Sequence, residues 1–86
     1  MKHAGQATLD ALDDLLVQLR ALGGMREKSR GVFYVRSKAF LHFHEDPTGL
    51  YADLRAGADF ERFKVDGLAQ QQLLVQSVRE LLGHGK

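Results

Sequence analysis

Leucines recur every three or four residues near the start of the chain, and this spacing predicts an amphipathic helix from about Leu9 to Leu22. Thr8 is the predicted N-cap, because a hydroxyl at that position accepts a hydrogen bond from the first helical turn. Gly23 and Gly24 end the predicted helix, since glycine accepts the left-handed backbone conformation of a helix C-terminus.

The middle of the chain alternates between apolar and polar residues, which is typical of β-strands. A polar connector over residues 25–30 precedes them. The run Asp46-Pro47-Thr48-Gly49 is a strong turn signal, because proline fixes one turn dihedral and glycine tolerates a positive φ. The predicted strands cover residues 32–35, 39–45 and 50–55, and a shorter fourth strand covers residues 59–65. In the fourth strand, Phe63 and Val65 lie on one side and Arg62 and Lys64 on the other.

A second apolar stripe near the end of the chain predicts another helix, with Asp66 as its N-cap and Gly83 at its end. The stripe consists of Leu68, Leu74, Val75, Val78, Leu81 and Leu82. The predicted fold over residues 1–86 is therefore one α+β domain in the order α-β-β-β-(β)-α. An antiparallel sheet of three to four strands is flanked by N- and C-terminal helices, which pack on one face as a two-layer sandwich.

The turn at residues 46–49 also predicts the register of the strands beside it, because it pairs Glu45 with Leu50. Counting outward, Phe43 faces Ala52 and Phe40 faces Arg55. One face, assigned to the core, then carries Leu41, Phe43, Leu50, Ala52 and Leu54. The other carries Phe40, His42, His44, Tyr51, Asp53 and Arg55, and a tight turn at Ser37-Lys38 would add Phe33 and Val35 to it.

This second face is half aromatic and half ionisable, a composition typical of an interaction surface. Its six residues are the candidate binding residues. Arg55 would attract a small anionic ligand, the two histidines would make binding pH-dependent, and the aromatic rings would supply apolar area. The first interpretation is a binding module that forms a homodimer or takes a ligand through this face. In the alternative, the last helix or the connector covers the face.

An enzyme is a second and less favoured interpretation. His42 lies opposite Asp53 in the predicted register, and a carboxylate beside an imidazole can prepare it for acid–base chemistry. The same geometry also describes an ordinary cross-strand polar pair. No convincing nucleophile accompanies the two residues, so catalytic residues are not assigned.

Metal binding is a third interpretation, since His42 and His44 project from the same side of a strand. The carboxylate of Asp53, Glu45 or Asp46 would complete the set. A structural zinc site normally takes four protein ligands and a catalytic one takes three, so this interpretation ranks below the interaction surface. His3 and His84 lie near the ends of the chain and are poor candidates. No cofactor is predicted.

Composition narrows these alternatives. The 86 residues include no cysteine, which excludes a disulfide scaffold and any thiolate site. The net charge is only +1, so the chain as a whole does not attract nucleic acid. A basic cluster is present, but no recognition motif accompanies it, so nucleic acid is not an expected partner. The cluster consists of Arg26, Lys28, Arg30, Arg36 and Lys38. No apolar run approaches the roughly 20 residues that cross a bilayer, and no secretory signal opens the chain, so a cytoplasmic protein without a membrane partner is expected.

Three segments resemble a family of small bacterial proteins of unassigned role. They are the run from Gly31 to Pro47, the run from Gly49 to Arg55 and the run from Phe60 to Val65. The chain is more loosely similar to the MmcQ/YjbR and TfoX N-terminal group, in which an aromatic strand leads through a basic turn into the next strand between terminal helices. The resemblance implies a compact α+β sandwich, with DNA-linked regulation as one option for its role, and it assigns no functional residue.

Overall fold

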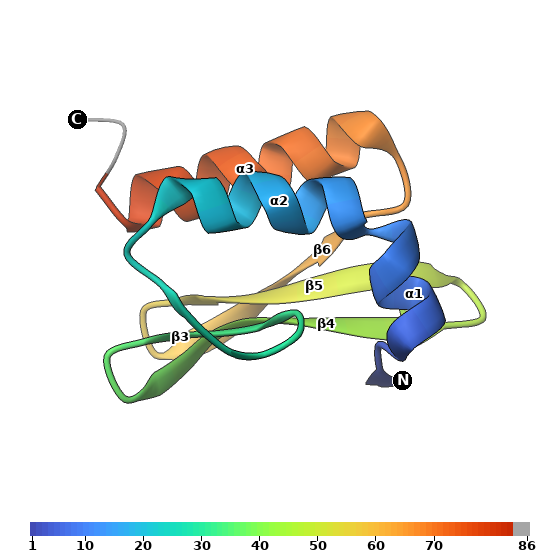
Figure 1. Cartoon of the computed structure of the whole chain (residues 1–86), viewed down its shortest axis with the longest axis horizontal. Coiled ribbons are helices and arrows are strands. Elements are labelled where there is room, and N and C mark those ends of the chain that lie inside the picture. The colour runs from blue at the N-terminus through green and yellow to red at the C-terminus, as the bar shows by residue number, and fades with distance from the viewer. Residues whose placement is uncertain (84–86) are drawn as a thin grey trace.

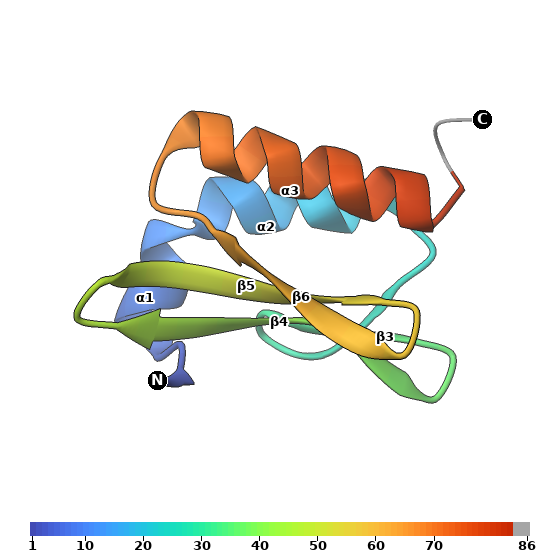
Figure 2. The ribbon, with the colours of Figure 1, turned by 180° about the vertical axis from the view of Figure 1, so that it is seen from behind.

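Two helices cover one face of an antiparallel sheet in the computed structural model, which describes residues 1–83 (Figure 1). The helices α2 (Asp13–Leu22) and α3 (Leu68–Leu81) lie side by side above the strands. The short helix α1 (Gln6–Ala11) stands at one end of the sheet, and the view from behind shows the same two layers (Figure 2). The predicted two-layer α+β arrangement is confirmed.

The sheet has six strands, two more than the largest number predicted. Its main path runs β2-β3-β4-β5-β6, and β1 pairs with β4 outside this path. The two unexpected strands are β1 and β2, which have two and four residues. Both are polar and largely exposed, so they carry no apolar alternation to detect. The strands are β1 (Lys2–His3), β2 (Arg26–Ser29), β3 (Val32–Val35), β4 (Lys38–Asp46), β5 (Gly49–Ala56) and β6 (Asp59–Lys64).

The register predicted for β4 and β5 is confirmed along most of the hairpin. The pairs run without a break from Leu41 opposite Leu54 to Glu45 opposite Leu50. Asp46 closes the turn as expected, because its carboxylate accepts a hydrogen bond from the backbone N–H of Thr48 at 3.1 Å. The two faces predicted for these strands therefore exist between residues 41 and 54.

Phe40 does not lie on the predicted face, and a β-bulge is the reason. Phe33 pairs with Leu41, but the next residue, Tyr34, pairs with Ala39, so Phe40 is an extra residue in β4. A bulge turns two successive side chains to the same side of the sheet. Phe40 and Phe33 are therefore in the core, 8% and 1% exposed. Their predicted place on the helix-free face is wrong.

The helix boundaries also differ from the prediction. The first helix is broken at Leu12 (φ −98°, ψ 12°), which gives α1 and α2. Thr8 is not an N-cap, because it lies inside α1 and its hydroxyl donates a hydrogen bond to Glu45 of β4. Asp66 is not one either, since its carboxylate accepts a hydrogen bond from the backbone N–H of Leu50. Both side chains bind the sheet rather than a helix end.

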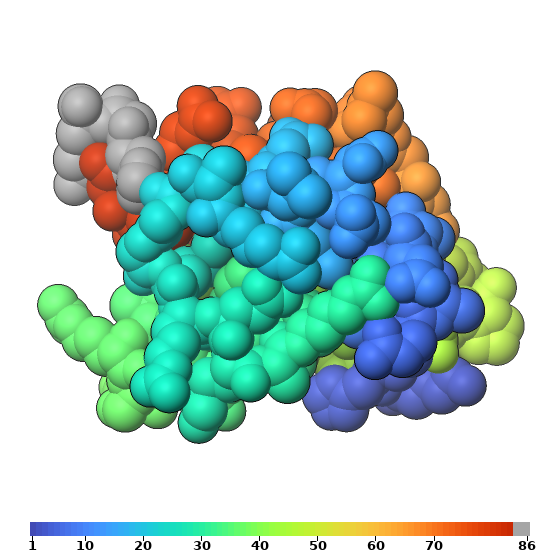
Figure 3. Space-filling view, in the orientation of Figure 1, coloured from blue at the N-terminus to red at the C-terminus, as the bar shows by residue number. Residues whose placement is uncertain are grey.

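The core lies between the helices and the sheet. Leucines of α2 fill it from above, and Leu54 of β5 and Val65, which follows β6, fill it from the sheet side. Phe63 packs against this core while Arg62 and Lys64 face away, as predicted for β6. The segment containing β2 lies below α2 and closes one side of the molecule (Figure 3). None of the helices that the structure describes is long and apolar enough to cross a membrane.

The bulge can be tested by comparing two phenylalanines. Replacing Phe40 with alanine empties a core position and should cost about 3–5 kcal/mol of the free energy of unfolding. Phe60 is 38% exposed on β6, so Phe60→Ala should cost about 1 kcal/mol or less. Urea denaturation of both variants measures the difference. Equal and small costs would mean that Phe40 lies on the helix-free face after all.

Candidate metal centre on the open sheet face

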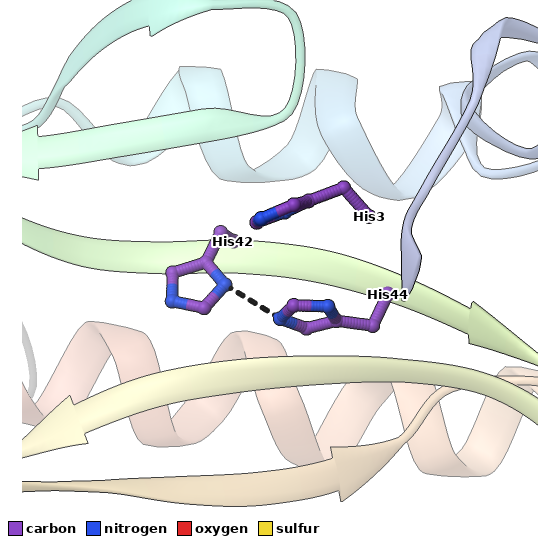
Figure 4. Close-up of side chains that lie close together, drawn as sticks. All are labelled: His3, His42 and His44. Atoms are coloured by element: carbon purple, nitrogen blue, oxygen red, sulfur yellow. Dashed lines mark hydrogen bonds between the residues drawn. The ribbon is translucent and has the colours of Figure 1, made fainter. Parts of the chain in front are cut away.

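The face of the sheet opposite α2 and α3, called here the open face, carries a cluster of histidines. Figure 4 shows His42 and His44 on β4 with His3 above them, all on the side away from the helices. Strand alternation places His42 and His44 together, because residues i and i+2 point to one face. His3 reaches them from a different part of the chain, at the N-terminal strand β1.

His3 is in the cluster because β1 is hydrogen-bonded to β4. Lys2 pairs with Glu45 and His3 pairs with His44, and the N–H of Ala4 donates to the carbonyl of Phe43 at 3.1 Å. The rings of His3 and His44 stack with centroids 4.8 Å apart. The expectation that His3 is a poor candidate is therefore wrong. His84, rejected on the same grounds, lies outside the described residues.

The three imidazoles are close enough to share one ion. One ring nitrogen from each histidine lies within 4.8 Å of the other two. His42 Nδ1 and His44 Nε2 form a hydrogen bond of 2.9 Å, drawn as the dashed line in Figure 4. Zinc–nitrogen bonds of 2.0–2.1 Å in a tetrahedral site separate the nitrogens by about 3.3 Å. The observed separations, 2.9 Å for this pair and at most 4.8 Å for the others, bracket that value.

Asp53 lies beneath the cluster and is neutralised by Arg62. The aspartate is 7% exposed, and both of its oxygens accept hydrogen bonds from Arg62, from Nε at 2.8 Å and from Nη2 at 2.9 Å. This two-point contact holds the pKa of Asp53 below its usual value. Asp53 is therefore a carboxylate at neutral pH, and its burial is offset by a charged partner.

His44 connects this carboxylate to the other histidines. Its Nε2 lies 3.2 Å from Asp53 Oδ2, and since a carboxylate only accepts, Nε2–H is the donor. A neutral His44 then carries its lone pair on Nδ1. That atom is buried and has no hydrogen-bond partner among residues 1–83. A buried lone pair without a donor is unusual. An ion shared with His42 would bind Nε2 instead, which lies 2.9 Å from His42 Nδ1, and would replace the proton on Nε2.

The predicted His42–Asp53 dyad does not form. The two residues are opposite each other in the register, but among the described side chains Asp53 contacts Arg62 and His44 instead. Arg62 was not identified from the sequence, because its role depends on the β5–β6 register that pairs it with Asp53. Sequence alternation along β6 does put Arg62 on this face, which is the signal that could have found it.

Two other predicted binding residues, Tyr51 and Arg55, lie on the open face but have partners of their own. The hydroxyl of Tyr51 is 2.8 Å from that of Thr48. Arg55 Nε donates to the carbonyl of Ala39 at 2.7 Å, and its guanidinium lies over the ring of Phe60. Of the six predicted binding residues, the histidine cluster thus gathers His42, His44 and Asp53.

His42 is held in its neutral form at neutral pH. Its pKa is lowered from 6.5, chiefly because partial burial penalises the charged ring and also because His44 lies beside it, while Asp53 opposes the shift. A neutral imidazole is the form that binds metals. The cluster therefore needs no proton removed from His42 before it can coordinate an ion.

A scan against models of known protein families, a search of curated proteins and a search of solved structures found no match for this chain. The resemblance to the MmcQ/YjbR and TfoX N-terminal group stays a prediction.

The lowered pKa of His42 predicts how stability depends on pH. Between the folded pKa of His42 and its unfolded value near 6.5, the unfolded chain binds more protons, so the free energy of unfolding rises with pH. Acidification from about pH 7.5 to about pH 5.5 should therefore destabilise the protein. Urea denaturation at both pH values measures the loss.

His42→Gln is the matched variant for this measurement, because glutamine keeps a polar side chain that does not titrate. The variant should lose less stability over the same pH interval than the wild type. Carboxyl groups with lowered pKa values, such as Glu27 and Asp53, titrate at lower pH and affect both proteins alike. An unchanged pH dependence in the variant would contradict the lowered pKa of His42.

Proposed function

We propose that this protein is a binding module that takes a divalent transition-metal ion on its open face, with His3, His42 and His44 as the ligands. The observation that carries the proposal is the convergence of three imidazole nitrogens, from β1 and β4, within 4.8 Å of one another. Three histidines from two separate segments make a more specific site than the two adjacent ones visible in the sequence. A bacterial, cytoplasmic setting stays a prediction from the sequence.

The chemistry of the donors supports zinc, nickel or copper rather than magnesium or calcium, because imidazole suits the former and oxygen ligands the latter. The carboxylate of Asp53 lies 3.2 Å from His44 Nε2, and its negative charge would attract a cation bound at that nitrogen. Arg62 offsets part of this charge through two hydrogen bonds to Asp53.

Three protein ligands leave the fourth position of a tetrahedral ion open to water or to a small anion. His3, a member of the cluster, and Phe60, which lies beside His42, are both exposed. A ligand can therefore reach the ion from solvent. A small anion in this position would be held by the ion, whereas the anionic ligand expected from the sequence would be attracted by Arg55.

Zinc titration tests the proposal directly. Isothermal calorimetry with Zn²⁺ should show one site per chain at neutral pH. Binding should release more protons at lower pH, because the ion then displaces protons from the imidazole nitrogens. His3→Ala should weaken binding at least about tenfold, because it removes one of three ligands. The side chain of His3 is exposed, so the variant should fold like the wild type.

Lys2→Ala is the control for this titration, since Lys2 sits on the same two-residue strand and carries no ligand atom. Its zinc affinity should match that of the wild type. Co²⁺ should give the absorption bands of a tetrahedral site in the wild type and lose them in His3→Ala. Binding that is unchanged by loss of His3 would rule out the three-histidine site.

Self-association through the open face is a second candidate function. It is favoured by Phe60, a residue that is 38% exposed. The centroid of its ring lies 4.9 Å from that of His42, and the guanidinium of Arg55 lies over the ring. Exposed aromatic area beside charged groups is typical of protein interfaces. The helices leave this side of the sheet uncovered (Figure 2), so two copies could pair through it.

Light scattering across a concentration series tests self-association. The wild type should approach the mass of a dimer as its concentration rises, and Phe60→Ala should shift that transition to higher concentration. Repeating the series with a chelator and with zinc separates a metal-linked dimer from one that forms without metal. A monomer under all of these conditions would exclude the homodimer and leave the zinc titration unaffected.

A further inference from the structure

A hollow of about 340 Å³ lies at one end of the molecule, where the β3–β4 turn, the end of β5 and the last turn of α3 meet. In Figure 3 the β3–β4 turn, in light green, projects beyond the body of the protein at this end. The volume is within the range of about 300–1,000 Å³ that is typical of small-molecule sites. None of the three clustered histidines lines this hollow.

The walls of the hollow are partly apolar. Val35 of β3, Phe40 of β4 and Leu81 of α3 line it. Phe40 is available here because the bulge turns it toward the helix side of the sheet. Leu81 is 47% exposed, although it belongs to the apolar stripe of α3. An apolar ligand in the hollow would remove part of this surface from water.

Three cationic residues, Arg36, Lys38 and Arg55, line the same hollow, and no acidic residue does. None of the three forms an ion pair with a carboxylate among the described residues. Elsewhere in the described chain, cations such as Arg20 and Arg62 are paired with carboxylates. The hollow is thus a place where positive charge is left without compensation beside apolar surface.

The backbone of the turn contributes to this arrangement. Arg36 has a φ of 59°, the one positive value among non-glycine residues of the described chain. An arginine in this conformation is strained, and glycine or asparagine would fit better. The turn therefore keeps an arginine where a residue without a long side chain would fit the backbone better, a kind of strain that is often found at binding sites.

We propose that this hollow binds a small amphipathic anion, with its apolar part against Val35, Phe40 and Leu81 and its carboxylate or sulfonate beside Arg36 and Lys38. The site is independent of the histidine cluster, and neither proposal depends on the other. The apolar walls select a hydrocarbon or aromatic body, and the unpaired cations select a negative head group. A neutral molecule of the same shape would leave the cations without a partner.

Fluorescence of 1-anilinonaphthalene-8-sulfonate, an aromatic anion, is the first readout with the full chain. The probe should brighten on binding, and octanoate should displace it. Octanol, which has the same chain length without the charge, should displace it at least about tenfold more weakly. The double variant Arg36→Gln/Lys38→Gln should bind octanoate about tenfold more weakly. Leu81→Asp, which puts a negative charge on the apolar wall, should abolish displaceable binding.

Lys2→Gln is the matched control, because it removes one exposed cation at β1, outside this hollow, and should leave octanoate binding unchanged. Circular dichroism and urea denaturation establish that each variant is folded. Leu81 and Lys38 are on the surface, so these changes should not unfold the protein. Equal displacement by octanol and octanoate would overturn the proposal. So would full octanoate affinity in the double variant, or absence of probe binding to the wild type.

Discussion

The pairing of β4 with β5 determines which side chains reach the helices and which reach the open face. Side chains alternate along a strand, so a slip of one residue would exchange the two sets completely. The turn at Asp46 sets the register, because its carboxylate binds the backbone of Thr48 and Gly49 has a φ of 145°. Every later feature, from the leucine core to the histidine cluster, depends on this hairpin.

The bulge at Phe40 divides the sheet into two regions with different chemistry. Toward the Asp46 turn, alternation is regular and the histidines share the open face with Asp53. Toward the β3–β4 turn, the extra residue moves Phe40 into the core and brings it to the wall of the basic hollow. One inserted residue thus separates the candidate metal centre from the second candidate site.

The sequence predicted the structure correctly where the residue types suit only one of the two faces of a strand. The β4–β5 register followed from one turn signal and from leucines and histidines that belong on different faces. It failed at Phe40 because a phenylalanine fits either face, so nothing in the local pattern indicates a bulge. Strands β1 and β2 are too short and too polar to show alternation. Arg62 lay on the correct face, but its pairing with Asp53 required the β5–β6 register.

The same limit explains why the site was predicted only in part. His42 and His44 are near in sequence, so their shared face could be derived from strand geometry alone. His3 is distant in sequence, and its position depends on a two-residue ladder with β4. The contact of His44 Nε2 with Asp53 depends in turn on a third strand, β5. Contacts of this kind follow from the three-dimensional arrangement and have no local signature.

In the proposed site, metal binding and the docking of β1 are thermodynamically coupled. Two residue pairs with β4 hold β1 against the sheet. An ion that binds His3 together with His42 and His44 binds only the form in which β1 is docked. The free energy of docking therefore becomes more favourable as the concentration of the ion rises above its dissociation constant, and it does so logarithmically. The reverse also holds: any contact that keeps β1 docked raises the affinity for the ion. The hydrogen bond from Thr8 to Glu45 holds α1 against β4 beside β1. In the proposed site it would raise the affinity for the ion without touching the ion.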